Sequence, residues 1–490
     1  MTVDGELLAQ TYYRHGTSQL TDVTFANGQW STLGYDRHGR QISADLRDTN
    51  TEFPKDTHVA TRSPAGRITE LASFEDGDSL FPDLRGAEIH YDGAGRVIEW
   101  HGPDGIERYG YDEAECGFAL AGRNTNRTSV STPAGTRTYC YDEADRLIKG
   151  GSADALQYDD RGNTLATGWD RYAYDATSRL IAAFSDIKDG YTEYTRDPVH
   201  RVAQRVSWRD GAQTTAVYGY SGFGEHVTFL ADTAGRVIER YVSLPGGVRV
   251  TLSGGTQRWA HADLIGNVAV VLDEHGDLVS ERASYNPWGE GAPPRSQDGT
   301  AQPGFLGTDG RLTDLVDEFD PIIDMGARTY HPELGRFLNV DPVVGGCAND
   351  YVYVYGDPIN SSDPKGTFSC WKDGVGWALS VAALGLGIAS LAALGPAAFA
   401  LGAGSLLLGG GAALLDIDAC FARGKGDSCA LLGIGLASIG LGAGGTLLRH
   451  WSAGTLLGLG SAATGTLPVL APFQGSGGPR GSGGRAGTRC

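Results

Sequence analysis

The sequence lacks the short motifs that mark the commonest soluble enzymes. It contains neither a Gly-x-x-x-x-Gly-Lys-Ser/Thr phosphate loop nor a His-Glu-x-x-His zinc motif. Its seven cysteines form no Cys-x-x-Cys pair, and their odd number leaves at least one thiol unpaired if the chain is a monomer. We therefore expect no cofactor and no metal site.

Basic charge is also scarce. The 40 Lys and Arg residues face 59 Asp and Glu residues, which gives a formal net charge of −19. Broad capture of nucleic acid or of an anionic membrane is disfavoured by this balance, so we expect no nucleic-acid partner. Residues Met1–Glu6 form neither a basic segment nor an apolar run, so no secretory signal peptide is visible, and export would need another route or an upstream portion.

Charge almost disappears near residue 368. Only four acidic and seven basic side chains follow residue 367, against 55 and 33 before it. The first part is polar, aromatic and rich in turn residues, whereas the second consists largely of Gly, Ala and Leu. We place a domain boundary between them.

Repeats are the strongest signal in the first part. Tyr35–Ile42, Tyr91–Ile98 and Tyr141–Ile148 share a Tyr-Asp-x-x-Gly-Arg-Val-Ile-like pattern, and Ala231–Ile238 keeps its second half. Looser copies start at Tyr158, Tyr174 and Tyr194.

The pattern predicts one hairpin per repeat. Asp can accept hydrogen bonds from backbone amides two residues ahead, Gly supplies the positive φ of a tight turn, and the apolar pair begins the return strand. Because such hairpins bury their aromatic faces only against one another, the repeats predict a mainly β fold with one extended, coiled or closed sheet.

These repeats resemble the Tyr-Asp (YD) repeats of Rhs proteins, the group that includes bacterial polymorphic toxins, the C component of insecticidal toxin complexes and the teneurin shell. The match continues downstream, where Ala327–Pro342 (Ala-Arg-Thr-Tyr-His-Pro-Glu-Leu-Gly-Arg-Phe-Leu-Asn-Val-Asp-Pro) resembles the Rhs repeat-associated core. Tyr285–Glu290, Asn349–Pro358 and Asp363–Gly366 also resemble that core. The resemblance covers roughly residues 30–367.

This resemblance implies a spiral β-sheet shell, complete or partial, closed around the protein's own C-terminal region and plugged by the core segment. We expect an apolar α-helical hairpin region and a disordered tail to follow. The expected parts are a YD/Rhs-repeat β-shell at 1–290, the repeat-associated core at 291–367, an apolar membrane-spanning or enclosed region at 368–450, and a flexible Gly/Ser-rich tail at 451–490.

The resemblance also implies a self-cleavage site. In several bacterial members the core cuts the chain just after Asp-Pro-x-Gly-Leu; carried over here, Asp341 and Asp363 would be the paired carboxylates, Arg328 a supporting cation, and Thr367-Phe368 the scissile bond. Two carboxylates held close can share a proton and divide the roles of acid and base, as in aspartyl-type proteolysis. The alternative is a structural seal, because Thr367 replaces the usual Leu, His331 follows Tyr330 where the core has Asp, and Asp-Pro pairs recur elsewhere as turns.

Two other patterns favour structural roles. His261 and Asp263 could form a metal pair, but the family has this segment as a strand-turn-strand. Tyr351, Tyr353 and Tyr355 alternate at period two, which predicts three rings on one strand face, and their acidic flanks favour packing over nucleic-acid stacking.

The C-terminal region is a poor candidate for an enzyme. It contains one His, no Glu and four Asp. It does contain two uncharged stretches, 374–415 and 428–448, that are long enough to cross a bilayer as helices. The alternatives are weakly apolar filler enclosed by the shell and a degenerate toxin remnant.

These observations predict a secreted or surface- or membrane-associated Rhs-family shell that encapsulates or presents a membrane-active C-terminal region, as polymorphic toxins do in competition between cells. The expected partners are its own C-terminal region, membrane lipid, an immunity protein and a secretion apparatus. The rival functions are an adhesion module with a membrane anchor, and a self-cleaving shell with a degenerate toxin remnant.

Overall fold

The computed structural model divides the chain into two compact units, Met1–Phe368 and Ser369–Cys490. It describes residues 1–368 except 4, 49–53, 76–83, 104, 114–115, 152–155, 186–189, 210, 223, 280–281, 293–301, 315–320, 344–346 and 348. The helical hairpin and disordered tail that we expected after residue 368 lie outside the described residues, and the four-part division of the chain stays a prediction. Within the described part, no helix is long and apolar enough to span a membrane.

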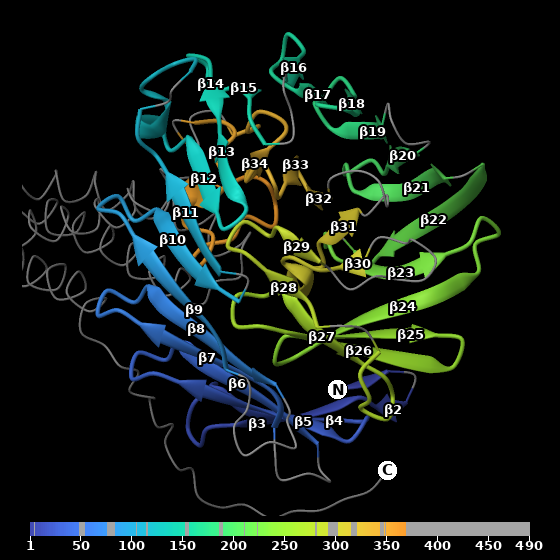
Figure 1. Ribbon diagram of the computed structural model, residues 1–490. Helices are drawn as coiled ribbons and strands as arrows, with labels where there is room; N and C mark the ends of the chain where they lie inside the picture. The colour runs from blue at the N-terminus through green and yellow to red at the C-terminus, as the bar shows by residue number, and fades with distance from the viewer. Residues whose placement is uncertain are drawn as a thin grey trace, which may run out of the picture. The chain divides into compact units, whose positions relative to one another are not determined.

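Two large antiparallel sheets make up most of the first unit, and in both sheets the strands pair in chain order (Figure 1). The first sheet has eleven strands: β3 (Ala9–Tyr13), β4 (Leu20–Phe25), β5 (Gln29–Tyr35), β6 (Gln41–Asp48), β7 (Pro54–Arg62), β8 (Ile68–Glu75), β9 (Leu84–Tyr91), β10 (Val97–Gly102), β11 (Gly105–Gly110), β12 (Ser129–Thr132) and β13 (Gly135–Thr138).

The second sheet has twelve strands: β16 (Leu156–Tyr158), β17 (Thr164–Thr167), β18 (Asp170–Tyr174), β19 (Leu180–Ser185), β20 (Tyr191–Arg196), β21 (Val202–Arg209), β22 (Ala212–Tyr220), β23 (Val227–Ala231), β24 (Val237–Leu244), β25 (Val248–Ser253), β26 (Thr256–Ala262) and β27 (Val268–Leu272). Neighbouring hairpins in both sheets confirm the mainly β fold that the repeats predicted. The expectation of one sheet is wrong for the described strands, because the ladder is interrupted between β13 and β16.

A smaller sheet belongs to the core segment: β30 (Gln302–Pro303), β31 (Leu312–Asp314), β32 (Ile322–Met325), β33 (Arg328–His331) and β34 (Arg336–Phe337). The remaining elements are the strand pairs β1 (Thr2–Val3) with β2 (Glu6–Leu7), β14 (Cys140–Tyr141) with β15 (Leu147–Lys149) and β28 (Ser284–Tyr285) with β29 (Gly291–Ala292), and the 3-10 turns η1 (Ala121–Asn124), η2 (Gly307–Asp309) and η3 (Val354–Gly356).

Each repeat turn is organised by its aspartate. In the turn between β9 and β10, Asp92 Oδ1 accepts hydrogen bonds from the amides of Ala94 and Arg96, both at 2.9 Å. Asp92 Oδ2 accepts from Arg96 Nε at 2.7 Å, and Gly95 has a φ of 88°. The same carboxylate–arginine turn recurs at Asp36, Asp142, Asp197 and Asp232.

The arginine of a turn also links its hairpin to the next one. Arg96 lies 4.1 Å from the ring centroid of Tyr111 and donates to Gly122 O at 2.7 Å. Arg201 lies 4.2 Å from the Tyr220 ring, whose hydroxyl donates to Val202 O at 2.7 Å. A cation over an aromatic face is attractive, so these contacts add to strand pairing between repeats.

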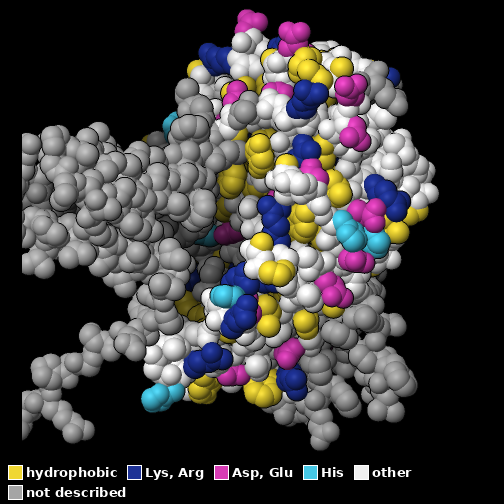
Figure 2. All heavy atoms as spheres, turned by 90° about the vertical axis from the view of Figure 1, so that its left-hand side faces the viewer, with side chains coloured by type: hydrophobic (Ala, Val, Ile, Leu, Met, Phe, Trp, Pro, Cys, Tyr) yellow, Lys and Arg dark blue, Asp and Glu magenta, His cyan; other side chains and the backbone are white. Residues whose placement is uncertain are grey.

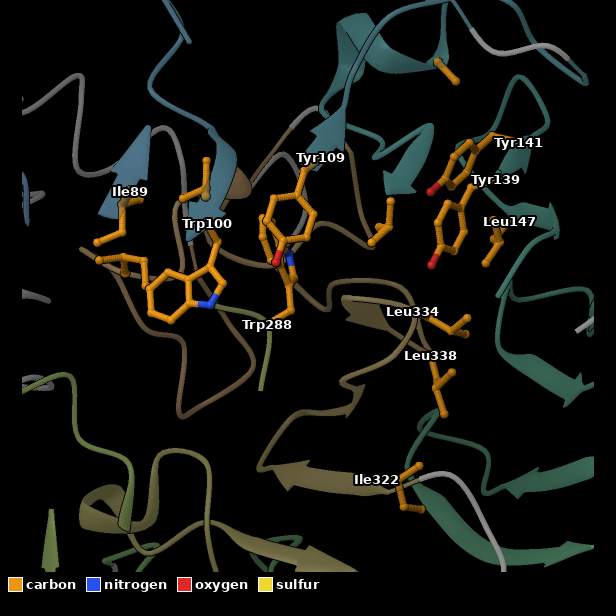
Figure 3. Close-up of a cluster of buried hydrophobic side chains, with 14 of the residues drawn as sticks. Ile89, Trp100, Tyr109, Tyr139, Tyr141, Leu147, Trp288, Ile322, Leu334 and Leu338 are labelled. Carbon is orange, nitrogen blue, oxygen red and sulfur yellow. The ribbon is translucent and has the colours of Figure 1, made fainter. Parts of the chain in front are cut away.

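The core segment packs against the inward side chains of the first sheet. Figure 3 shows Trp100 and Tyr109 from this sheet beside Trp288, with Leu334 and Leu338 of the core nearby. The ring centroids of Tyr109 and Trp288 are 4.1 Å apart.

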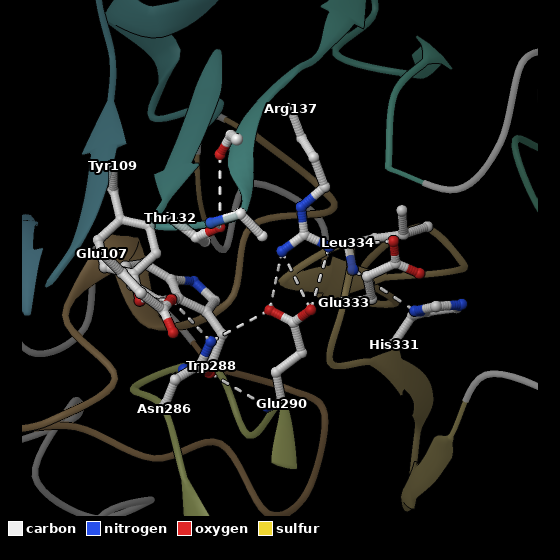
Figure 4. Close-up of polar contacts among 12 residues, drawn as sticks. Glu107, Tyr109, Thr132, Arg137, Asn286, Trp288, Glu290, His331, Glu333 and Leu334 are labelled. Atoms are coloured by element: carbon white, nitrogen blue, oxygen red, sulfur yellow. Dashed lines mark hydrogen bonds and ion pairs between the residues drawn. The ribbon is translucent and has the colours of Figure 1, made fainter. Parts of the chain in front are cut away.

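Ion pairs strengthen the same junction. Figure 4 shows Arg137 of β13 between two core carboxylates, at 3.0 Å from Glu290 and 3.1 Å from Glu333. The core segment is therefore attached to the wall by both apolar and charged contacts.

The start of the first sheet meets the end of the second. Phe25 of β4 packs on Trp259 of β26 with ring centroids 5.8 Å apart. Lys55 donates to Gly276 O at 2.6 Å, and Arg282 pairs with Asp56 at 2.8 Å. The chain thus curves back on itself. Among the described strands no backbone hydrogen-bond ladder joins the two sheets here, and side-chain contacts connect them instead.

Candidate functional site

The three residues expected to form the self-cleavage site lie together in the core segment. Arg328, at the start of β33, places Nη2 3.0 Å from Asp341 Oδ2 and 2.9 Å from Asp363 Oδ2. Both carboxylates therefore lie against the same nitrogen. All three side chains are almost fully buried, with exposed fractions of 1%, 2% and 4%.

The other donors of Arg328 are held by the backbone. Nε donates to Gly366 O at 2.8 Å and Nη1 to Asp350 O at 3.0 Å. The guanidinium carbon lies 3.6 Å from the ring centroid of Phe337. Because a guanidinium offers five N–H groups in a rigid fork, these contacts fix its orientation between the two carboxylates.

Asp363 organises the turn that carries the expected scissile bond. Its Oδ1 accepts from the Thr367 amide at 2.9 Å, and its Oδ2 accepts from the Phe368 amide at 3.0 Å. The second amide nitrogen belongs to the Thr367–Phe368 peptide bond itself. One carboxylate oxygen therefore touches the atom that would leave if this bond were hydrolysed.

Gly366 is required by the same turn. Its φ is 62°, and a Cβ at this position would lie 2.6 Å from Met325 O and 2.7 Å from Arg328 N. Any side chain would push the turn away from β32 and β33, and with it the carbonyl that receives Arg328 Nε.

Burial distinguishes the Asp341 carboxyl group from that of an exposed aspartate. Desolvation raises the pKa of Asp341; Arg328 opposes this rise, while the neighbouring Asp363 carboxylate adds to it. Desolvation also lowers the pKa of Arg328, and Asp341 and Asp363 oppose that change. Asp341 is thus held as a more basic carboxylate than an exposed aspartate, which suits a general base.

A cavity of about 220 Å³ lies beside the turn, between the core and the second sheet, and Lys365 and Thr367 form part of its lining. Arg311 and Asp324 line it from the core. The lining is mainly apolar but includes charged side chains such as Arg196 and Glu225, which can hydrogen-bond water inside a cavity of this size. The peptide bond after Thr367 is consequently close to a space from which water could reach it.

The structure places His261 and Asp263 in separate roles. Asp263 caps a repeat turn, with Oδ1 accepting from the amides of Ile265 and Asn267, both at 2.9 Å. His261 is buried in β26, and desolvation lowers its pKa to about 4. The turn assignment for this segment is confirmed.

The expected aromatic strand face at Tyr351, Tyr353 and Tyr355 is wrong. Tyr351 and Tyr353 are buried at 2% and 1% exposed, but Tyr355 is 44% exposed. The backbone turns at η3, where Val354 and Tyr355 have φ values of 40° and 57°. The alternation fails because this segment is a turn rather than a strand.

Sequence reasoning missed several supporting groups. The Asp350 carbonyl and the Phe337 ring contact Arg328, yet neither follows from a motif. A disulfide joins Cys116 and Cys140 across 24 positions, and no cysteine spacing predicted it.

The two meandering sheets and the core segment packed against them form the architecture of a β-shell built from hairpin repeats. A family profile described as Teneurin YD-shell matches residues 87–346, more than half of the chain. The chain belongs to the teneurin YD-shell family, and the expected likeness to Rhs/YD-repeat proteins is confirmed.

Curated relatives share about a quarter of their aligned residues with this chain. The tRNA3(Ser)-specific nuclease WapA of Bacillus spizizenii is 24% identical over 278 residues, covering 55% of this chain and 11% of that protein. Teneurin-m of Drosophila melanogaster is 23% identical over 356 residues, covering 69% and 12%. The double-stranded DNA deaminase toxin A of Burkholderia cenocepacia is 25% identical over 351 residues, covering 69% and 22%.

The chain thus spans between about a tenth and a quarter of the length of these relatives. Among solved structures, that of TcdB2-TccC3-TEV aligns with a TM-score of 0.58 at 18% identity, over 74% of this chain and 20% of that one. This likeness shows that the two share a fold.

Proposed function

We propose that this chain is an Rhs-type shell that holds its own C-terminal region and separates it by cutting the Thr367–Phe368 bond. The observation that carries the proposal is the position of Asp363, whose Oδ2 lies 3.0 Å from the Phe368 nitrogen and 2.9 Å from Arg328. Asp341 completes the pair through the same arginine nitrogen.

The proposed reaction is a hydrolysis in which the two carboxyl groups carry one proton between them. Asp341 removes a proton from a water that attacks the Thr367 carbonyl carbon. Asp363 gives the shared proton to the Phe368 nitrogen as the C–N bond breaks. The products are a Thr367 carboxyl group and a Phe368 amine, and the pair ends with one proton, as it began.

Arg328 is a positioning residue in this scheme. Its buried charge lowers the cost of placing two carboxylates side by side, and its contacts with Gly366 and Asp350 hold the turn against them. The structural alternative, a seal without cleavage, uses the same contacts but needs no proton transfer.

The test is the denatured mass of the purified full-length chain. We expect fragments 1–367 and 368–490 from the wild type, and a cleavage rate lowered by about 100-fold or more in Asp341→Asn and Asp363→Asn. The exposed Asp160→Asn is the matched control, because none of the described contacts joins Asp160 to Arg328, Asp341 or Asp363. Circular dichroism verifies that each variant is folded. If the wild-type chain stays intact, the self-cleavage proposal is wrong and the core acts only as a structural seal.

The proposal of a toxin-like role rests on the sequence similarity of the chain to known toxins. Two of the relatives named above are described as a nuclease and as a deaminase toxin, each far longer than this chain. We infer a polymorphic-toxin-type shell that acts outside the producing cell or at a surface, with an immunity protein and a secretion apparatus as partners.

For the released region we propose membrane activity. Residues 374–415 and 428–448 contain no charged side chain, and each stretch exceeds the roughly 20 residues that cross a bilayer as a helix. Expression of residues 368–490 in the bacterial periplasm should depolarise the inner membrane. If growth is unchanged and the fragment is found in the membrane, the result would favour an adhesion module with a membrane anchor. If growth is unchanged and the fragment is not in the membrane, the result would favour an inert toxin remnant.

A further inference from the structure

Four side chains of types that can bind metals gather on the solvent side of the β9–β10 hairpin, and none of them belongs to the Arg328, Asp341 and Asp363 cluster. Glu88 and His90 lie on β9, and Glu99 and His101 lie on β10. The strand register pairs Glu99 with His90 and His101 with Glu88. The intervening Ile89 and Trp100 are buried, at 3% and 7% exposed, so the four polar side chains share the opposite face.

Contacts link the four groups into one cluster. Glu88 joins the two histidines, with Oε1 3.3 Å from His90 Nε2 and Oε2 3.9 Å from His101 Nδ1. His101 Nε2 contacts Glu99 Oε1, and the two imidazole centroids are 5.4 Å apart. Figure 2 shows two neighbouring histidine side chains bordered by acidic side chains on the face that it displays.

The geometry approaches that of a metal site. One ligand atom each from His90, Glu99 and His101 lies within 4.8 Å of the others. Zinc binds imidazole nitrogen and carboxylate oxygen at about 2.0–2.2 Å in tetrahedral geometry, which needs ligand atoms somewhat closer together. His90 and Glu88 are about half exposed, so their side chains can rotate inward without moving a strand.

The charge and orientation of Glu99 also suit a cation. Arg108 on β11 donates from Nε to Glu99 Oε2 at 2.7 Å, which leaves Oε1 directed at the histidines. An outer contact of this kind fixes the orientation of a ligating carboxylate. Two neutral imidazoles and two carboxylates would balance the charge of a divalent ion, and the Arg108 guanidinium adds one positive charge next to them.

We propose that Glu88, His90, Glu99 and His101 bind one zinc-class divalent cation that clamps β9 to β10 on the outer wall of the shell. Two nitrogen and two oxygen ligands on borderline-soft groups favour zinc over magnesium or calcium, which prefer oxygen alone. No sequence motif indicated this site, because its ligands alternate along two strands and meet only through the hairpin register.

The test uses the full-length chain, stripped with a chelator and titrated with zinc chloride by calorimetry. We expect one tight site per chain, weakened about tenfold or more in His90→Gln and in His101→Gln, and about tenfold in Arg108→Gln. His15→Gln, an exposed histidine in a turn, is the matched control and should bind as the wild type does.

Two further readouts separate this site from thiol binding elsewhere. Cobalt should give the visible bands of tetrahedral nitrogen and oxygen ligation, without the near-ultraviolet charge-transfer absorption of a cysteine thiolate. Zinc should raise the Tm of the wild type and of His15→Gln, and leave that of His90→Gln unchanged. Binding that survives both histidine changes, a thiolate spectrum, or no binding at all would overturn the proposal.

Discussion

One position in each repeat turn has a positive φ, and this backbone conformation favours glycine over other residues. Three places after the aspartate, Gly39, Gly95 and Gly235 have φ values of 78°, 88° and 80°. The equivalent positions in other repeats hold residues that have a Cβ and yet also have a positive φ: 59° at Asp145, 63° at Ser178 and 69° at His200. A residue with a Cβ is disfavoured there by about 1–2 kcal/mol.

Asp145 and Ser178 have side-chain contacts that offset this cost. Asn126 Nδ2 donates to Asp145 Oδ1 at 2.5 Å, and Ser178 Oγ lies 3.1 Å from Asn163 Nδ2. His200 is exposed, and among the described residues no partner donates to or accepts from its side chain to offset the cost.

We therefore predict that His200→Gly raises the free energy of unfolding by about 0.5–1 kcal/mol, measured by urea denaturation. The opposite substitution is Gly235→Ala. An added Cβ would meet no atom within 4 Å there, so its cost comes only from the positive φ of the backbone. It should lower the same free energy by about 1 kcal/mol. Changes of the same sign in both variants would refute the account of this position.

The elements follow from the sequence wherever local chemistry decides them. The repeat hairpins were predictable because Asp, Gly and the following apolar pair specify a turn and a return strand without reference to the rest of the chain. The turn at η3 was not, because Tyr351, Tyr353 and Tyr355 keep the alternation of a strand although the backbone bends at Val354 and Tyr355. The Cys116–Cys140 disulfide likewise depends on how the chain folds around η1.

The aspartate turn also predicts how hairpin stability depends on pH. Burial raises the pKa of Asp197, but hydrogen bonds from Arg201 and from the Val199 amide outweigh it and leave that pKa below its usual value. The unfolded chain then takes up a proton at a higher pH than the folded one. The stabilisation by this carboxylate is present above about pH 4 and is lost as pH falls through the folded pKa.

Asp197→Asn should therefore lower the free energy of unfolding most at neutral pH and progressively less between pH 4 and pH 2. Urea denaturation of both proteins across this range measures the gap. The exposed Asp160→Asn is the control and should show a smaller gap throughout. A gap for Asp197→Asn that is constant with pH would show that its carboxylate charge does not stabilise the turn.

For the molecule as a whole, repetition indicated a continuous wall but not how the wall closes. The packing of Phe25 on Trp259 and the pairing of Arg282 with Asp56 join residues more than 200 positions apart, and no periodicity locates such contacts. The Arg328, Asp341 and Asp363 cluster was expected only through family resemblance, and its catalytic role stays a prediction. The cluster of histidine and glutamate side chains on β9 and β10 was not predicted from the sequence at all.

The central claim is that the shell both cuts and retains its own C-terminal region, and one comparison tests it most directly. Mass spectrometry of the freshly purified full-length protein should show a single assembly near 51.7 kDa under native conditions, resolving on denaturation into chains ending at Thr367 and beginning at Phe368. A single uncut chain after denaturation, or separate fragments already present under native conditions, would contradict it.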